Sequence, residues 1–437
     1  MKRLFISSGF SLFVLLASAQ RAQQDTLANA TLQACVQYAL KHYPLVQQAL
    51  LDEQITDREI KSKLADWYPQ VNLNANYQNN FQLPAILFGG QLVRSGAYNQ
   101  STVGVALSQN LFTRDVLLAL KTKNDVMTNI RQQTTSDKID VTVNVSKAFY
   151  DVLLTRKQID VLNDDIVRLE RNYKDAYNQY RGGLVDKTDY KRATIALNNS
   201  KAELKTNQEG LKARYQVLKQ LMGYTAPDSL HLVYDSAQME AEVNVDTLAL
   251  LDYSKRIEFQ QLTTQKRLQQ ADVKYQKWAY IPTVTAGAGY SLNYLNNRFS
   301  PLYKDNYPQS YAGLQVAFPI FQGTKRQQNI RVAELQLTRI DWDIINLQTA
   351  ISTQYSQALA TYKSNLNNYY VLRENLELAR DVFNTIDLQY RSGVKAYLEL
   401  ITAETDLRTA QSNYSDALYQ VLSSKLDVQK ALGTITY

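Results

Sequence analysis

The chain has 437 residues, of which only 15 are glycine and 8 are proline, whereas 30 are tyrosine and 45% are hydrophobic. So few turn-forming residues predict few, long elements, and the hydrophobic share excludes an intrinsically disordered chain. The formal charge of +7 falls to +5 when Lys2 and Arg3 are set aside, and the remaining basic residues form no block. A nucleic-acid-binding role therefore has no support.

Residues 1–19 have the pattern of a secretory signal peptide. Lys2 and Arg3 precede the largely apolar run Leu4–Leu16, and Ala17–Ala19 has the small-x-small form of a cleavage site. The alternative, a membrane anchor, requires about 18 to 20 apolar residues, which this run does not reach. No later segment reaches that length, so export predicts either a periplasmic protein or a β-barrel of the outer membrane.

Residues that could carry chemistry are few. The one cysteine, Cys35, has no partner for an internal disulfide and does not have the position of a lipid-anchored cysteine, so we expect a buried, unreactive thiol. His42 and His231 lie in unrelated segments without metal-ligand spacing. Neither a nucleophile elbow nor a phosphate loop is present. The sequence therefore predicts no enzyme, no cofactor and no metal site.

The chain contains an internal repeat with an offset of 210 residues, because Tyr180–Gly183 returns as Tyr390–Gly393 and Leu221–Gly223 returns as Ala431–Gly433. Before each tip glycine, apolar residues alternate by three and four, which is typical of a coiled-coil seam. These residues are Ile159, Leu162, Ile166, Leu169, Tyr173, Ala176 and Tyr180, and then Tyr369, Leu372, Leu376, Ala379, Phe383, Ile386 and Tyr390.

After the tip glycines, leucine, valine or tyrosine recurs every seven residues, which implies left-handed supercoiling. The positions are Tyr190, Leu197, Leu204, Leu211 and Leu218, and then Leu400, Leu407, Tyr414, Val421 and Val428. Each half is therefore predicted to hold two long antiparallel helices joined by a tight turn near Gly183 or Gly393. An ordinary helical bundle would show the same seams.

Four segments switch to period two and predict strands at about 70–79, 101–111, 283–293 and 310–319. Apolar residues on one face and polar residues on the other suit a transmembrane β-strand of about 9 to 11 residues, although a half-buried soluble sheet shows the same alternation. Strands one and three are preceded by aromatic residues that we interpret as an interfacial girdle. These residues are Trp67, Tyr68, Trp278 and Tyr280.

The loops between paired strands, 80–101 and 295–309, are long, as outer-surface loops usually are. The first of them contains the apolar run Leu83–Phe88, to which the sequence assigns no role. Four strands cannot close a barrel without leaving unpaired backbone groups in lipid. Subunits must therefore pool strands, and assemblies of two, three or four chains are all compatible with this count.

Helix lengths predict the path of the chain between the two ends of the molecule. Two continuous patterns, from Arg114 to Tyr180 and from Lys325 to Tyr390, each run for about 66 residues, or roughly 100 Å. On the return, we expect Val185–Met222 to stack end to end with a helix Val245–Lys277, and Lys395–Leu432 to stack with an N-terminal helix Leu27–Asp66. Strands then lie at one end of the molecule and glycine turns at the other.

Together these features resemble the TolC family of outer-membrane efflux and secretion channels over essentially the whole mature chain. The resemblance is carried by Leu32–Leu40 with Tyr43–Pro44, by the strand exits Leu107–Phe112 and Val316–Phe321, and by the tips near 181–186 and 391–396. It implies a mainly α protein with membrane β: a homotrimer with a 12-stranded β-barrel, four strands per chain, continued by a long periplasmic α-helical coiled-coil tube.

The organisation implied by the resemblance and the repeat is a signal peptide at 1–19, a first repeat at 20–223, an equatorial linker at 224–244 and a second repeat at 245–437. The resemblance places the protein in the outer membrane of a Gram-negative bacterium, reaching into the periplasm. There it would be a passive exit duct, opened by a periplasmic adaptor (membrane fusion protein) coupled to an inner-membrane pump of RND, ABC or MFS type, in efflux or in type I secretion.

The resemblance also assigns roles near the tips. By position, the links that close the gate fall on Thr188, Asp189, Tyr390 and Lys395. Glu399 matches an acidic ring at the pore entrance, whereas Thr402 stands where the family's best-known member has a second acid. Adaptor docking is assigned to Gly182, Gly183, Leu184, Val185, Ser392, Gly393 and Val394.

Two other classes of protein compete with this interpretation. A soluble secreted coiled-coil scaffold would account for the heptads equally well but not for four amphipathic strands flanked by tryptophan. A plain porin would account for the strands but not for the share of sequence in heptads. Finding the protein in the detergent-insoluble outer-membrane fraction separates the scaffold from the channel.

Overall fold

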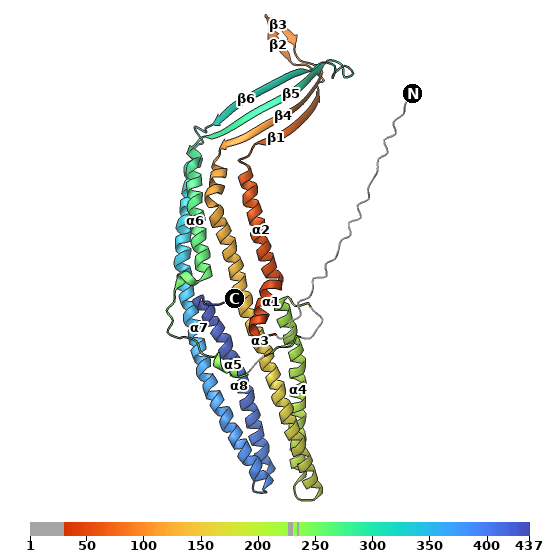
Figure 1. The fold of residues 1–437 in the computed structure, drawn as a ribbon, viewed down its shortest axis with the longest axis vertical. Helices are drawn as coiled ribbons and strands as arrows, with labels where there is room; N and C mark the ends of the chain where they lie inside the picture. The colour runs from red at the N-terminus through yellow and green to blue at the C-terminus, as the bar shows by residue number, and fades with distance from the viewer. Residues whose placement is uncertain (1–29, 226–229, 234–235) are drawn as a thin grey trace, which may run out of the picture.

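The computed structural model describes residues 30–225, 230–233 and 236–437, so the predicted signal peptide at 1–19 lies outside the described residues. The molecule is elongated, with a curved sheet at one end and two helical hairpin tips at the other (Figure 1). This layout confirms the fold class predicted from the sequence.

Two very long helices run the length of the helical part, α3 (Arg114–Arg181) and α7 (Lys325–Arg391), with 68 and 67 residues. From each tip a helix of 36 residues returns, α4 (Lys187–Met222) or α8 (Tyr397–Leu432). The predicted heptad seams are where these helices are buried, for example at Leu162, Leu169 and Ala176 on α3. Within the described part of the chain, no helix combines the length and the apolarity needed to cross a bilayer.

The predicted stacking of the returning helices is wrong. The end of α4 lies against the junction of α1 (Leu32–His42) and α2 (Pro44–Ala65), whereas the end of α8 lies at the start of α6 (Ile257–Lys277). A Cβ on Gly223 would lie 2.6 Å from the His42 carbonyl oxygen, and one on Gly433 would lie 2.6 Å from that of Lys255. Only glycine permits this approach together with the positive φ found at both positions.

The lengths of two predicted helices also need correction. The helix expected over Leu27–Asp66 is interrupted at Tyr43, which is extended (ψ 127°) because Pro44 follows it; residues 27–29 lie outside the described part. The helix expected from Val245 begins only at Ile257. A short 3-10 turn, η1 (Tyr253–Lys255), precedes it, and the Asp252 side chain caps this turn by accepting from the Ser254 N–H at 3.0 Å.

The sheet is antiparallel in the order β1 (Gln70–Asn79), β4 (Asn99–Phe112), β5 (Thr283–Asn296) and β6 (Tyr307–Ala317). Its register pairs Leu73 with Val105, Val105 with Tyr290, and Ala288 with Ala312. In the single chain every residue of the two outer strands, β1 and β6, is exposed. Both edges of the sheet and its apolar face are therefore open.

The apolar run Leu83–Phe88 forms part of a second, unpredicted sheet. Strands β2 (Ala85–Phe88) and β3 (Gln91–Arg94) pair as a hairpin that turns at Gly89 and Gly90. The hairpin projects beyond the end of the main sheet (Figure 1), and its side chains are exposed. The sequence contained the signal, since two glycines between apolar runs favour a hairpin.

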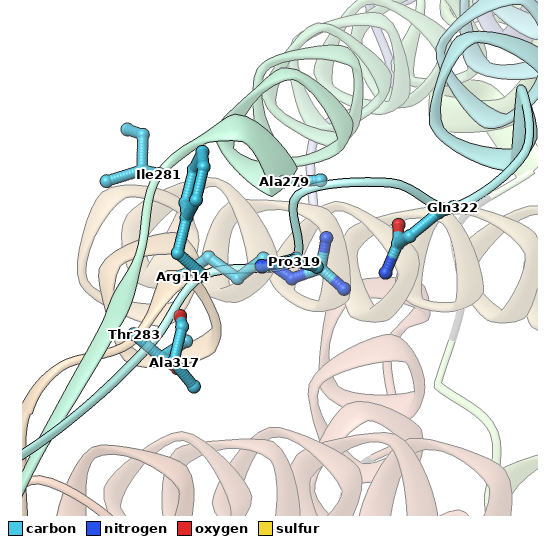
Figure 2. A pocket seen from close by; sticks show the side chains of 8 residues that line it. Arg114, Ala279, Ile281, Thr283, Ala317, Pro319 and Gln322 are labelled. Carbon is cyan, nitrogen blue, oxygen red and sulfur yellow. The ribbon is translucent and has the colours of Figure 1, made fainter.

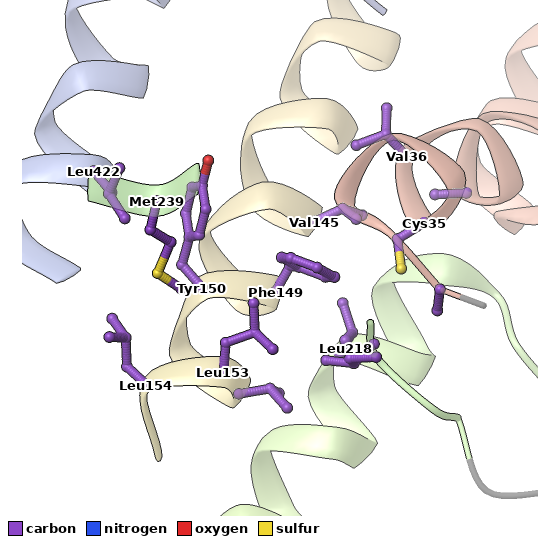
Figure 3. Packing of buried hydrophobic residues seen from close by; sticks show 14 of the residues in the cluster. Cys35, Val36, Val145, Phe149, Tyr150, Leu153, Leu154, Leu218, Met239 and Leu422 are labelled. Atoms are coloured by element: carbon purple, nitrogen blue, oxygen red, sulfur yellow. The ribbon is translucent and has the colours of Figure 1, made fainter. Parts of the chain in front are cut away.

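The main hydrophobic core lies halfway along the molecule, where α1, α3, α4 and α8 meet (Figure 3). Phe149 of α3 and Leu218 of α4 are fully buried beside Cys35 of α1, and Leu422 of α8 closes the other side. Burial raises the pKa of the Cys35 thiol to about 12, so the thiol stays protonated. The predicted burial of Cys35 is confirmed.

Tyrosine hydroxyls of α7 hold the segment between α5 (Ser236–Ala241) and η1. Tyr362 is fully buried, donates to the Val243 carbonyl at 3.0 Å and accepts from the Val245 N–H at 3.0 Å. Tyr355 donates to the Ala249 carbonyl at 2.8 Å. A long side chain with a polar end can satisfy irregular backbone from a neighbouring helix, which explains part of the high tyrosine content.

We expect Tyr362→Phe to lower the free energy of unfolding by about 1 to 3 kcal/mol, because it leaves one buried and one partly buried backbone group without their partner. The matched control is Tyr370→Phe, since Tyr370 is 46% exposed and bonds Asn244 at 3.3 Å; that change should stay within about 0.5 kcal/mol. Denaturant unfolding followed by circular dichroism measures both, and equal effects of the two substitutions would contradict the anchoring role.

Candidate functional site: the two hairpin tips

The first tip is a helix end closed by a glycine in the left-handed conformation. Gly183 has φ +69°, and its N–H donates to the Tyr180 carbonyl at 3.0 Å. The next N–H, from Leu184, donates to the Gln179 carbonyl at 2.9 Å. This pair of bonds is the Schellman motif, which uses the last free carbonyls of a helix.

The second tip repeats this geometry. Gly393 has φ +75° and donates to the Tyr390 carbonyl at 2.9 Å, while Val394 donates to the Gln389 carbonyl at 2.9 Å. Ser392 replaces the preceding glycine without strain because its φ is −82°. The sequence repeat at 210 residues is therefore also a repeat of backbone geometry.

Both tips present apolar side chains to solvent. Leu184 is 79% exposed and Val394 is 72% exposed, although the residue at this position of a Schellman motif usually packs back on its helix. A Cβ on Gly183 or Gly393 would meet nothing within 4 Å. Each tip therefore offers a small, partly apolar surface with open space around it.

The two helices that leave the tips begin differently. Asp186 caps α4, because its carboxylate accepts from the Thr188 N–H at 3.3 Å, and Asp189 follows in the first turn. Ala396 precedes α8 and offers no side-chain cap, while Glu399 lies in the first turn. Acidic residues in a first turn interact favourably with the helix dipole.

The predicted gate residues lie close to the tips, on facing elements. The Lys395 ammonium forms an ion pair with the Glu399 carboxylate of its own chain. Tyr390 packs edge-on against Tyr397, with ring centroids 5.8 Å apart. Burial, followed by nearby acidic groups that include Asp189, raises the pKa of both tyrosines.

Among the described residues of one chain, no hydrogen bond joins Asp189 to Tyr390 or Lys395. The links proposed for the gate, and the acidic ring at Glu399, therefore stay predictions about an assembly of several chains.

Four polar residues near the tips were missed by sequence reasoning. Asn172 of α3 donates to a carboxylate oxygen of Glu404 on α8 at 3.1 Å, and Arg168 pairs with Asp165 and lies 3.6 Å from the other Glu404 oxygen. Asp165 and Glu404 are only 1% and 5% exposed. The available signal was the spacing of Asp165 and Asn172 by seven residues, which the apolar seam beside it obscured.

The predicted interfacial aromatic residues lie where the helices join the sheet. Trp67 is 41% exposed, Tyr68 is 67% exposed and Tyr280 is 47% exposed. The Lys121 ammonium lies over the Trp278 ring, 4.8 Å from the ring centroid. Their position at the end of the sheet suits a membrane interface, and contact with lipid stays a prediction.

A pocket of about 590 Å³ lies at this same junction, lined by Arg114, Ile281, Thr283, Pro319 and Gln322 among others (Figure 2). Beside it the buried Arg326 donates to the carbonyls of Ala279 at 3.4 Å and Ile320 at 3.3 Å, and also to that of Pro319. Its guanidinium lies 4.8 Å from the Tyr280 ring centroid. Arg326 therefore satisfies the irregular backbone between sheet and helix.

Metal chemistry has no candidate in the part of the chain that the structure covers, since no cluster of three His, Cys, Asp or Glu side chains occurs there.

Comparison with known proteins gives a consistent result. The model of a family described as outer membrane efflux protein matches residues 35–224 and 254–434. The chain is 21% identical to outer membrane protein TolC of Escherichia coli over 413 residues, which covers 90% of this chain and 80% of TolC. It is 22% identical to the probable efflux pump outer membrane protein TtgC of Pseudomonas putida over 433 residues, covering 95% and 86% of the two chains.

Among solved structures, that of CusC has a TM-score of 0.75 at 16% identity and covers 95% of both chains, which shows a shared fold. The family model spans more than half of this chain, and the matched segments contain both tips and all four strands of the main sheet. The chain therefore belongs to the TolC family of outer membrane efflux proteins, the outer-membrane channels of efflux pumps.

Proposed function

We propose that three copies of this chain form one channel, whose periplasmic tips are held shut at rest and opened by an adaptor coupled to an inner-membrane pump. The observation that carries the proposal is the four-stranded sheet with two open edges. Backbone groups left unpaired in lipid would cost several kcal/mol each, so β1 of one copy must pair with β6 of the next. Three copies then supply twelve strands.

The sheet's apolar face supports the same proposal and opposes a soluble scaffold. Leu73, Leu314 and Val316 are 72%, 70% and 63% exposed. A contiguous exposed surface of this kind marks a membrane or protein contact, and lipid is the contact that an outer-membrane location provides.

Mass measurement of the detergent-solubilised complex is expected to show three chains, dissociating on heating. A stable monomer that retains its β-sheet signal in circular dichroism would contradict pooled strands, since it would show that the open edges need no partner.

We further propose that the adaptor docks at the two tips. The support is their shared geometry, in which Leu184 and Val394 occupy equivalent exposed positions beside glycines that leave room for a partner's backbone. A turn that requires a positive φ explains the glycines alone but not the two exposed apolar side chains beside them.

The combined substitution Leu184→Glu and Val394→Glu should abolish efflux and adaptor capture, because each places a charge in an apolar contact, while the yield of trimer stays unchanged. Leu248→Glu is the control, since Leu248 is 87% exposed but lies between α5 and η1, away from the tips. Normal efflux by the tip variant, with normal adaptor capture, would rule out docking at this surface.

The gate is proposed to depend on links from Tyr390 and Lys395 to Asp189 of a neighbouring helix pair. A phenol and an ammonium can both donate to a carboxylate. Each exposed link contributes only about 0.2 to 1 kcal/mol, and Lys395 would have to exchange its Glu399 partner for Asp189. Three repeats would total a few kcal/mol, which adaptor binding can reverse.

We expect Asp189→Ala combined with Lys395→Ala to raise single-channel conductance in planar bilayers, and Glu399→Ala to weaken cation preference by removing an acidic ring. Arg391→Ala is the matched control, because Arg391 forms an exposed ion pair with Asp387 at the same tip. Conductance of the double variant equal to that of the parent would show that these links do not hold the gate.

A further inference from the structure

Toward the tips, the contact between the two helical hairpins of one chain contains a polar stretch among apolar residues such as Ala176, Ala193 and Leu400. On α3 and on α8, polar residues recur every seven positions along this stretch, and Asn172 and Arg168 contact Glu404 across it. We call these residues the polar seam: Gln158, Asp165 and Asn172 of α3, and Tyr397, Glu404 and Gln411 of α8. Because α3 runs toward the tip and α8 runs away from it, residue numbers rise toward the tip on α3 and fall toward the tip on α8 along this contact.

The centre of the polar seam is a buried cluster of charges. Asn172 donates to Glu404 at 3.1 Å, and the Arg168 guanidinium lies between the carboxylates of Asp165 and Glu404. Two carboxylates thus share this guanidinium, and the Arg408 guanidinium on α8 adds a second positive charge near Glu404. Keeping an ionised carboxylate away from water is costly, and one oxygen of Glu404 is buried without a hydrogen bond in the described chain.

The other elements around Glu404 contribute one further charge. On α8, Arg408 attracts the carboxylate while its guanidinium donates to the neutral Ser200 hydroxyl of α4 at 2.8 Å, so the two carboxylates and the two guanidinium groups balance in charge. On α7, the neighbour of the cluster is the Phe383 ring, 5.5 Å from the Arg168 Cζ. Tyr397, the nearest seam residue toward the tip, is buried and presents a hydroxyl that finds no acceptor within the single chain.

Several seam atoms are unpartnered in the packed arrangement. One oxygen of Asp165, the amide of Gln158 and the amide oxygen of Gln411 are buried without a hydrogen bond in the described chain. Buried polar groups of this kind stabilise a contact only when all are satisfied. Separation of the hairpins would expose these groups to water, which lowers the cost of opening this part of the contact.

Protonation of Glu404 shifts the equilibrium between packed and separated hairpins toward the packed state. Burial raises the pKa of the Glu404 carboxyl, although Arg168 and Asn172 oppose the change. In separated hairpins the carboxyl would return to water and to its ordinary pKa. The packed contact therefore holds the proton more tightly, so low pH favours packing and a pH rising through the raised pKa weakens it.

From this geometry we infer that the polar seam is a proton-sensitive joint, in which the α3–α8 contact stays packed while Glu404 is protonated and separates when Glu404 is ionised. One joint in every chain would make the separation of the hairpins depend on periplasmic pH. This inference rests on the proposed function in one respect only, namely that separation of the hairpins opens the gate.

The test uses the full-length complex with two independent readouts. Nitroxide labels at positions 184 and 394, in a Cys35→Ser background, report the distance between the tips at about pH 5 and about pH 8. Planar-bilayer recordings of the unlabelled complex report the ratio of open to closed time. In the parent, the distance distribution should lengthen and broaden at the higher pH, and the ratio should rise about tenfold for each unit by which packing raises the pKa of Glu404.

Three variants identify the titrating group. Glu404→Gln should behave at both pH values as the parent does at low pH, whereas Glu404→Asp should restore a pH response. Asp406→Asn is the matched control, because Asp406 is an exposed carboxylate on the same helix, and it should respond as the parent does. A purely structural role of Glu404 would change thermal stability without removing the pH dependence.

The outcomes separate this inference from the proposed gate. If Glu404→Gln keeps the parent's pH response, or Asp406→Asn also loses it, the joint at Glu404 is wrong. If the distance depends on Glu404 but the open time does not, the joint stands and its link to the gate fails. If the parent shows no pH response in either readout, the inference is overturned.

Discussion

Antiparallel hydrogen bonding between the strands determines which helices lie side by side. Helix α2 leads into β1 and α3 leaves β4, so pairing Val71 with Leu107 sets α2 beside α3. Helix α6 leads into β5 and α7 leaves β6, so pairing Val284 with Val316 sets α6 beside α7. The ladder between β4 and β5 then joins the two repeats, and α4 and α8 stack below α2 and α6.

Below the sheet, the helices are held together by two kinds of contact, those within each hairpin and those between the two hairpins. Inside the hairpins, Leu162, Leu169 and Leu400 are buried, and each such side chain contributes about 1.5 to 3 kcal/mol. Between the hairpins, apolar contacts such as those of Phe149 and Leu422 are joined by the polar seam, whose hydrogen bonds and charges are only partly satisfied.

Irregular backbone is stabilised by side chains that reach across from regular elements. Tyr362 and Tyr355 bond the segment between α5 and η1. Arg326 bonds two carbonyls between β6 and α7 and a third, that of Ala279, in the turn before β5. Buried backbone groups need such partners when no ladder supplies them. Long side chains with polar ends perform this role at both places, which relates the tyrosine-rich composition to the architecture.

Local pattern by itself determined much of this protein. A period of seven predicted the long helices, a period of two predicted the four sheet strands, and the repeated glycines predicted both tips, because each pattern reflects a backbone geometry within one segment. The break before Pro44 and the hairpin at Gly89 also follow from local rules.

Only the tertiary structure decided which segments meet. Helix lengths alone do not show that α4 stacks end to end on α1 and α2. Strand pairing between distant parts of the chain decides which helices become neighbours. The pairing of Asn172 with Glu404 spans 232 residues. Two faces of α3 carry residues at a seven-residue spacing, one apolar and one polar. Which helix each face is buried against is not encoded in any single segment, and that neighbour distinguishes an apolar seam from a buried cluster of charges.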